Sequence, residues 1–298
     1  MHVLVTGASG LLGSALETAL TGQDHTVTPL RRGNARNGPT WDPAAGTIDA
    51  AALEGVDAVI HLAGESLTGR WTASKKRRIW NSRVDGTRLL ASALAGLSTK
   101  PKVLVSVSGV NYYGDQGADC LREDSPPGAG FLPDLCQAWE AAADPAREAG
   151  VRTVHPRIGM VLSPEGGALA AMLPPFKFGL GGPFGNGRQY VSWIAIEDAV
   201  RAILFALENT GLAGPINLTT PNPVTNLKFT KTLARVLNRP AVFPVPRLAA
   251  RLLLGEMSDN LLFPSLRVMP ARLMAAGYGF RFPQLEDALR HALVRQDG

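Results

Sequence analysis

The sequence predicts an α/β fold, with a doubly wound parallel sheet followed by a smaller, mostly helical C-terminal lobe. Short apolar runs alternate with helical repeats through the first half of the 298 residues, as in successive βαβ units. The second half changes to glycine- and proline-rich segments and short helices. We therefore place the sheet domain at residues 1–165 and the lobe at residues 166–298.

A glycine turn joins the first strand to the first helix. The apolar run His2 to Thr6 breaks at Gly7. Glycine returns at Gly10 and Gly13, and a helical repeat starts at Leu11. Such a turn lets a phosphate approach the backbone at a helix N-terminus, which carries unpaired amides and partial positive charge. We expect dinucleotide contacts from Gly7, Ser9, Gly10, Leu11, Leu12 and Gly13. The spacing differs from the usual G-x-G-x-x-G, so a turn that only packs helix on strand is the alternative.

The second strand ends in two basic residues. His25 to Leu30 has strand character and is followed directly by Arg31 and Arg32. In dinucleotide folds an acidic residue near this point favours NAD, whereas guanidinium groups suit the 2′-phosphate of NADP. The alternative is a pair of surface arginines. We interpret the pair as specificity for NADP.

The remaining first-half elements continue the alternation. A small-residue turn, Ala63 and Gly64, follows the third strand and leaves room for a cofactor. Loops are expected at Gly33 to Gly46 and before Gly130. Strands are expected at Val56 to Leu62, at Val103 to Val107 and from Arg152 to His155, with helices at Lys75 to Leu97 and Leu135 to Ala149.

The second half is expected to form the substrate side of the cleft. Gly166 to Gly187 is rich in glycine and phenylalanine, and we interpret Phe176 to Arg188 as a lid. We then expect a helix at Ile196 to Leu207, with Asp198 in its first turn, and a brief strand at Ile216 to Leu218. A helix at Thr225 to Leu237, capped by Thr225 or Asn226, and a tail of short helices from Pro244 to Val294 complete the lobe.

Composition excludes several classes of protein. Hydrophobic residues make up 45% and charged residues 18% of the chain, with a formal net charge of +5, which suits an anionic small ligand. The basic cluster Lys75 to Arg78 has a helical pattern, so we expect no nucleic-acid partner. The longest apolar run, Leu248 to Leu254, is interrupted by Arg251, so no membrane partner is expected.

The cysteines and histidines point to an ordinary reducing compartment. Cys120 and Cys136 have no disulfide or metal-type spacing, and the five histidines form no metal pattern. We expect a cytoplasmic protein with no bound metal and a small-molecule substrate as its partner. A homodimer stays open.

Several separated segments together resemble one family. They are TGASGLLG, HLAG, VDGTRLL, SVSGVNYYG, PRIGMVL and WIAIEDAVRAI, which begin at Thr6, His61, Val84, Ser106, Pro156 and Trp193. In this order they resemble the extended short-chain dehydrogenase/reductases, the sugar-nucleotide epimerase and dehydratase-like group. The tail from Pro244 looks like the small C-terminal domain of an atypical branch of unsettled activity.

The resemblance implies an NADP-binding Rossmann domain, a smaller lobe, and an active site between them. It also implies that some C-terminal segments return to the Rossmann sheet. Arg83 stands where many relatives have asparagine and could reach the pyrophosphate or the 2′-phosphate, with a helix-surface arginine as the alternative. The other cofactor-lining residues that it implies are Leu62, Ala63, Gly64, Ser106 and Arg157.

One departure from the family concerns catalysis. Relatives use a Tyr-x-x-x-Lys pair, in which lysine lowers the tyrosine pKa. The best alignment puts Cys136 at the tyrosine and Glu140 at the lysine. Ser108 keeps the usual serine, and Tyr112 and Tyr113 could supply a phenol, although packing against the cofactor is their alternative role. Glu123 and Asp124 are further acids in the loop beyond. The candidate catalytic residues are therefore Ser108, Tyr112 and Tyr113.

Three functions are compatible with these features. The first is an NADP-dependent oxidoreductase or epimerase acting on a small polar or nucleotide-linked substrate. The second is a non-catalytic NADP-binding redox sensor or regulatory protein. The third, a scaffold without a cofactor, is the least favoured because the glycine turn is intact.

Overall fold

The central sheet has the strand order of a Rossmann fold. A computed structural model describes residues 1–33 and 38–294, and within them the sheet runs in the order β13-β9-β6-β5-β1-β2-β3-β4. All neighbours pair in parallel except β3 and β4, and the short β7 extends the pairing of β9. The strands are β1 (His2–Thr6), β2 (Thr26–Arg32), β3 (Thr40–Asp42), β4 (Thr47–Ile48), β5 (Ala58–His61), β6 (Val103–Ser106), β7 (Ser108–Gly109), β9 (Arg152–Ile158) and β13 (Gly214–Leu218).

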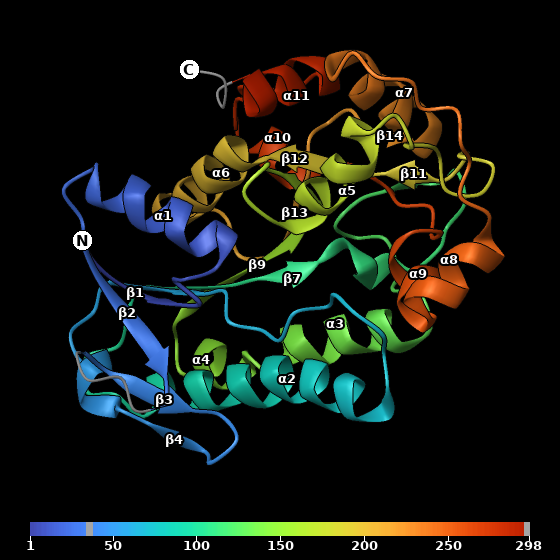
Figure 1. Cartoon of the computed structure of the whole chain (residues 1–298). Coiled ribbons are helices and arrows are strands. Elements are labelled where there is room, and N and C mark those ends of the chain that lie inside the picture. Colours follow the sequence, from blue (N-terminus) through green and yellow to red (C-terminus); the bar gives the residue numbers. More distant parts are fainter. Residues whose placement is uncertain (34–37, 295–298) are drawn as a thin grey trace.

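Helices cover both faces of this sheet, which confirms the predicted fold class (Figure 1). One face carries α1 (Leu11–Thr21) and α6 (Ile196–Glu208), and the other carries α2 (Ala73–Ala95), α3 (Phe131–Ala141) and α4 (Asp144–Glu148). Successive β1 side chains point to opposite faces: Val3 and Val5 pack with α1 and α6, whereas Leu4 packs with α2. This alternation follows from the two-residue period of a strand.

The C-terminal region is mainly helical and has its own core. Buried Trp193, Phe229 and Leu289 come together there from segments far apart in the chain. Thr225 caps α7, as predicted, by accepting a hydrogen bond from the Lys228 amide. The helices are α5 (Gly167–Lys177), α7 (Asn226–Val236), α8 (Arg247–Leu254), α9 (Glu256–Leu261), α10 (Ala271–Ala275) and α11 (Leu285–Val294). Short strands are β8 (Cys120–Leu121), β10 (Met160–Leu162), β11 (Tyr190–Val191), β12 (Trp193–Ala195), β14 (Val224–Thr225) and β15 (Arg267–Val268).

Two segments of the second half belong to the sheet layers. Strand β13 pairs with β9 at the edge of the sheet, and α6 packs beside α1. The division of the chain at residue 165 stays a prediction. In the ranges that the structure covers, no helix is both long and apolar enough to cross a bilayer.

Two local predictions are wrong in part. The predicted loop Gly33 to Gly46 contains β3, which pairs with Arg31 and Arg32 of β2; residues 34–37 lie outside the described residues. The predicted helix Leu135 to Ala149 is two helices, the first of which starts at Phe131. Pro145 lies in the first turn of the second helix, where proline fits because the amide that it lacks would have no partner within the helix.

The predicted lid, Phe176 to Arg188, begins inside a helix of the lobe, and its closure over a substrate stays a prediction. Phe176 lies in helix α5 and is buried in the lobe core. The glycines that follow are held by backbone hydrogen bonds, in which Gly185 donates to Val245 and Phe243 donates to Gly181. Sequence pattern missed α5 because it contains Pro174 and Pro175, which ordinarily argue against a helix.

Candidate dinucleotide site

The glycine turn leaves the N-terminus of α1 accessible. Gly7 has a φ of +71°, and a Cβ there would lie 2.9 Å from the Ala63 amide nitrogen. A Cβ on Gly13 would lie 2.2 Å from the Gly7 carbonyl oxygen. Only glycine fits both positions, and the helix therefore packs closely on β1. Its N-cap is the exposed Gly10, which has no side chain to accept from the first-turn amides. The turn is thus shaped for an anion.

A buried network fixes the neighbouring strand ends. The His61 ring bridges Thr6, whose Oγ1 lies 2.6 Å from Nδ1, and Thr87, whose Oγ1 lies 3.0 Å from Nε2. Thr6 Oγ1 also accepts from the Leu62 and Ala63 amides, and Trp139 Nε1 donates to Thr87. The network therefore holds the end of β1, directly before the glycine turn, against the loop after β5.

The pKa of His61 makes this network sensitive to acid. Burial, together with the charges of Arg32 and Arg83, lowers the pKa of His61 to about 3, whereas an unfolded chain has a histidine pKa of about 6.5. The unfolded state therefore binds the extra proton between these values, and the free energy of unfolding falls as pH drops through that window.

We expect His61 to remove about 3 kcal/mol of stability between pH 7 and pH 4, at 1.36 kcal/mol for each pKa unit. Urea unfolding of wild type and His61→Asn at several pH values measures this. The variant should have lower stability at pH 7 but a flatter pH dependence. Parallel curves for the two proteins would contradict the assignment.

Two guanidinium groups, those of Arg32 and Arg83, lie within electrostatic range of each other. Arg32, at the exposed end of β2, is near enough to Arg83 that its charge adds to burial in lowering the Arg83 pKa to about 10. Arg83 donates to the Glu65 carbonyl oxygen at 2.9 Å, lies over the Trp139 ring, and would be 3.1 Å from a Cβ on Gly64. Arg83 therefore stays charged at neutral pH. Two cations whose charges act on each other favour an anionic ligand.

The ends of β6 and β7 carry two buried serines. Among the residues that the structure covers, neither Ser106 Oγ nor Ser108 Oγ has a hydrogen-bond partner. Beside Ser108 lies the buried Cys136 thiol, whose pKa is raised to about 11 by burial and by the charge of Glu140. The thiol is therefore protonated and a poor nucleophile at neutral pH. Both serine hydroxyls are buried, and that of Ser108 lies against the Cys136 thiol.

Arg157 is committed to a buried ion pair, which argues against the predicted cofactor contact. It is 2% exposed, and its Nε and Nη2 donate to the two carboxylate oxygens of Glu140 at 2.8 and 2.9 Å. Nη1 donates to the Tyr113 hydroxyl at 2.9 Å. Burial alone would lower the pKa of Arg157. The hydrogen bonds to Glu140 and its negative charge outweigh burial, so the Arg157 pKa is raised.

The two tyrosines differ in their surroundings. Tyr113 is fully buried and donates to Asn217 Oδ1 at 2.7 Å. Burial raises its pKa to about 12, and this is only partly opposed by Arg157. Tyr113 thus has a structural role, contrary to its candidacy as a catalytic group. Tyr112 is half-buried, and the Arg157 guanidinium lies 3.4 Å from its ring centroid.

The loop acid Glu123 also has a structural role. Its Oε1 accepts from the Asn217 and Arg272 amides, so it joins β13 to the start of α10. Glu123 Oε2 has no hydrogen-bond partner among the described residues. Within residues 1–33 and 38–294, no group of three or more histidine, cysteine, aspartate or glutamate side chains comes together to hold a metal ion.

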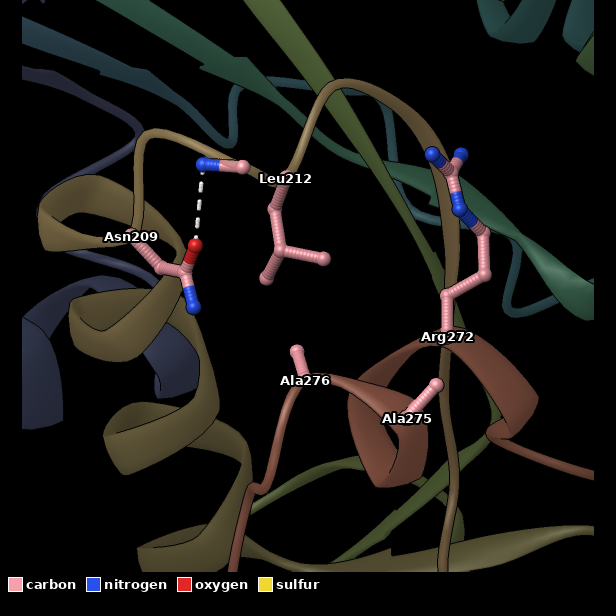
Figure 2. A pocket seen from close by; sticks show the side chains of 6 residues that line it. Asn209, Leu212, Arg272, Ala275 and Ala276 are labelled. Carbon is pink, nitrogen blue, oxygen red and sulfur yellow. Dashed lines mark hydrogen bonds between the residues drawn. The ribbon is translucent and has the colours of Figure 1, made fainter.

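A separate hollow of about 330 Å³ lies at the amino end of β13 (Figure 2). Asn209 and Leu212 line it before the strand starts, and Arg272 lines it from α10. The Arg272 guanidinium is used within the protein, since it donates to the Pro215 carbonyl oxygen at 2.8 Å. The hollow is therefore distinct from the glycine turn, which lies at the carboxyl end of β1.

The sheet order, the glycine turn and the cations beside it define a Rossmann-type protein with a phosphate-binding turn. The chain belongs to the NAD dependent epimerase/dehydratase family, which it matches over residues 3–218. Residues 245–292 match a second family, described as a domain of unknown function (DUF1731). The resemblance seen in the sequence motifs is thus confirmed.

Relatives match the chain over nearly its whole length. Epimerase family protein ML0860 of Mycobacterium leprae is 43% identical over 98% of this chain and 96% of its own. Human epimerase family protein SDR39U1 is 37% identical over 99% of this chain and 100% of its own. The crystal structure of human SDR39U1 (isoform 2) with NADPH has a TM-score of 0.89 and 35% identity, covering 98% of this chain and 99% of that one.

Proposed function

We propose that this protein binds NADP(H) across the carboxyl ends of β1, β2 and β5. The observation that carries the proposal is the glycine turn, in which Gly7 and Gly13 admit no side chain and Gly10 leaves the α1 amides uncovered. The pyrophosphate would be held by the backbone from Ser9 to Gly13. The presence of NADPH in the human SDR39U1 structure supports this proposal.

Arg32 and Arg83 would distinguish NADP(H) from NAD(H). Arg32 ends β2, where the adenosine ribose of a dinucleotide is recognised, and its charge acts on Arg83 of α2. A charge-assisted arginine–phosphate bond contributes about 1.5–3 kcal/mol. This energy corresponds to at least a tenfold preference for the phosphorylated cofactor.

Fluorescence titration with NADPH and NADH tests this preference. We expect wild type to bind NADPH at least about tenfold more tightly than NADH, and Arg31→Ala/Arg32→Ala to lose the difference while keeping its affinity for NADH. Arg147→Ala, which removes an exposed arginine of α4, serves as the control. Equal affinities in wild type would refute NADP specificity.

The bound cofactor would serve an oxidoreductase or epimerase acting on a small polar or nucleotide-linked substrate. When bound, the nicotinamide supplies hydride exchange. Among the residues of this chain, Ser108 offers a buried hydroxyl without a partner, which suits a substrate hydroxyl. The half-buried Tyr112 is the phenol that would exchange the proton, since Tyr113 is sealed and Cys136 stays protonated.

A specific observation favours the second function, a redox sensor without turnover. The position of the family's catalytic tyrosine holds a buried thiol, and the position of its lysine holds Glu140, which is bound to Arg157. Neither can lower the pKa of a neighbouring phenol. In a sensor, cofactor binding would be retained with no proton-transfer machinery beside it.

Single substitutions separate the two functions. If the protein is an enzyme, Ser108→Ala and Tyr112→Phe should abolish turnover with NADPH affinity unchanged, whereas Cys136→Ala should retain most activity. Tyr113→Phe should mainly lower stability, because Arg157 and Asn217 lose a partner. Turnover with NADPH over a panel of sugar nucleotides and small carbonyl compounds measures this. An inactive Cys136→Ala beside active tyrosine variants would reverse the assignment.

The wild type decides between enzyme and sensor. Tight NADPH binding with no turnover on any member of the panel would support the sensor. Turnover on even one substrate would exclude a purely non-catalytic role.

A further inference from the structure

The outer surface of the lobe exposes seven large apolar side chains. We call them the lobe patch, and each is between 55% and 80% exposed: Phe178, Leu180, Val242, Phe243, Leu248, Leu252 and Leu253. Ten large hydrophobic residues are exposed within the described residues, and seven of them belong to this patch. Soluble monomers rarely expose contiguous apolar patches beyond about 300–600 Å², and larger ones mark interaction sites.

Backbone pairing brings the two halves of the patch together. The segment after α5 lies beside the segment before α8, because Phe243 donates to the Gly181 carbonyl oxygen and Val245 donates to that of Pro183. This pairing places Phe178 and Leu180 near Val242 and Phe243. The second segment runs down the outer edge of the molecule and leads directly into α8 (orange in Figure 1).

Helix α8 turns its leucines outward. Leu248 and Leu252 are one turn apart and are 70% and 68% exposed, and Leu253 is 73% exposed. Ala250 takes the buried side of the helix at 1% exposure. In most helices of soluble proteins the large apolar residues face the core. In α8 the small Ala250 faces the core, and Leu248, Leu252 and Leu253 face outward.

Positive charge predominates around the patch, with Asp259 of α9 as an acid beside α8. Residues 166–196 and 209–255, which contain the patch, have no aspartate or glutamate and eight lysines and arginines. Lys177 and Arg239 are exposed next to patch residues. Arg247 and Arg251 of α8 are held by Asp259 of α9, at 2.8 and 3.4 Å. The partner that fits is therefore apolar in part and anionic.

This charge argues against a second copy of the chain as the occupant. Two identical patches related by a two-fold axis would face one another with the same excess of cations, which includes Lys177 and Arg239, because such an interface uses the same surface twice. An anionic lipid surface instead satisfies both components at once. Leucine and phenylalanine side chains would enter the interfacial region, while lysine and arginine would meet the lipid phosphates.

We infer that the lobe patch docks the protein on anionic membranes, with α8 lying in the plane of the lipid headgroups. The protein would bind as a peripheral protein, with no segment crossing the bilayer. This inference departs from the sequence-based expectation of no membrane partner, which rested on the absence of a run long enough to span. It is independent of whether the protein binds NADP(H).

Co-sedimentation of the whole protein with vesicles tests the inference. Vesicles of equal parts phosphatidylglycerol and phosphatidylcholine should retain wild type, whereas vesicles of phosphatidylcholine alone should not. Leu252→Asp/Leu253→Asp should weaken retention at least about tenfold, since two apolar side chains that would enter the lipid are replaced by anions. Met274→Asp is the matched control, because Met274 is also exposed, at 49%, but lies in α10.

Because Leu252 and Leu253 are exposed, the double variant should keep the wild-type melting temperature, and a matching melt confirms that it folds. Three results would overturn the inference. One is equal retention of wild type by neutral and anionic vesicles, and another is undiminished retention of the double variant. The third is a wild-type dimer in light scattering that the double variant converts to a monomer, which would assign the patch to a second copy.

Discussion

Replacing Glu140 with glutamine should lower the free energy of unfolding by about 3–5 kcal/mol, the usual cost of breaking one side of a buried ion pair. Arg157 would then be a buried cation, since its side chain is only 3% exposed and Glu140 supplies both carboxylate oxygens. The loss should extend to Tyr113, which the same guanidinium holds. Urea unfolding at pH 7 measures the change.

An exposed ion pair on the neighbouring helix provides the control. Asp144 pairs with Arg147 in α4 with both side chains largely exposed, so Asp144→Asn should cost at most about 1 kcal/mol. The double variant Glu140→Gln/Arg157→Met should recover part of the loss, because it removes the unpaired charge. A Glu140→Gln protein as stable as wild type would show that the pair does not hold α3 to β9.

Replacing Gly13 with alanine should disrupt both the fold and the cofactor site. The new Cβ would lie 2.2 Å from the Gly7 carbonyl oxygen and 2.7 Å from the Ala8 Cα, both backbone atoms that cannot rotate away. Helix α1 must then shift from the turn, at a cost of about 1–3 kcal/mol or more. The amides that would hold the pyrophosphate shift with it, so NADPH affinity should fall at least about tenfold for each bond lost.

Gly22, at the other end of α1, is the matched control. A Cβ there would lie 3.3 Å from the Thr18 carbonyl oxygen, and its φ of −67° suits alanine. Gly22→Ala should therefore keep wild-type NADPH affinity in the same titration. If Gly13→Ala also binds NADPH with wild-type affinity, the turn does not form the phosphate site.

Local pattern was enough to predict the sheet half of the fold. The apolar run His2 to Thr6, the glycines that follow it and the helical repeat of apolar residues from Leu11 all lie in neighbouring residues. Such local signals depend little on the rest of the chain. Helix α5 was missed because its prolines lie where tertiary packing, with Phe176 in the lobe core, overrides local preference.

The polar roles in the site could not be predicted in the same way. Arg157 lies in a strand motif that suggests a cofactor contact, yet its partners are Glu140, 17 positions away, and Tyr113, 44 positions away. Asp198 lies in the first turn of α6, as predicted. Its burial and the hydrogen bonds that it accepts from the Arg281 and Phe282 amides could not be predicted from the sequence. Only the folded chain brings such partners together, so spacing alone carries no signal for them.

The most direct test of the proposed function is a crystal structure of this protein grown with NADPH. The account predicts the pyrophosphate against the amides from Ser9 to Gly13 at the start of α1. It also predicts the 2′-phosphate within hydrogen-bond distance of Arg32 or Arg83. A cofactor bound elsewhere, or none at saturating NADPH, would contradict the account.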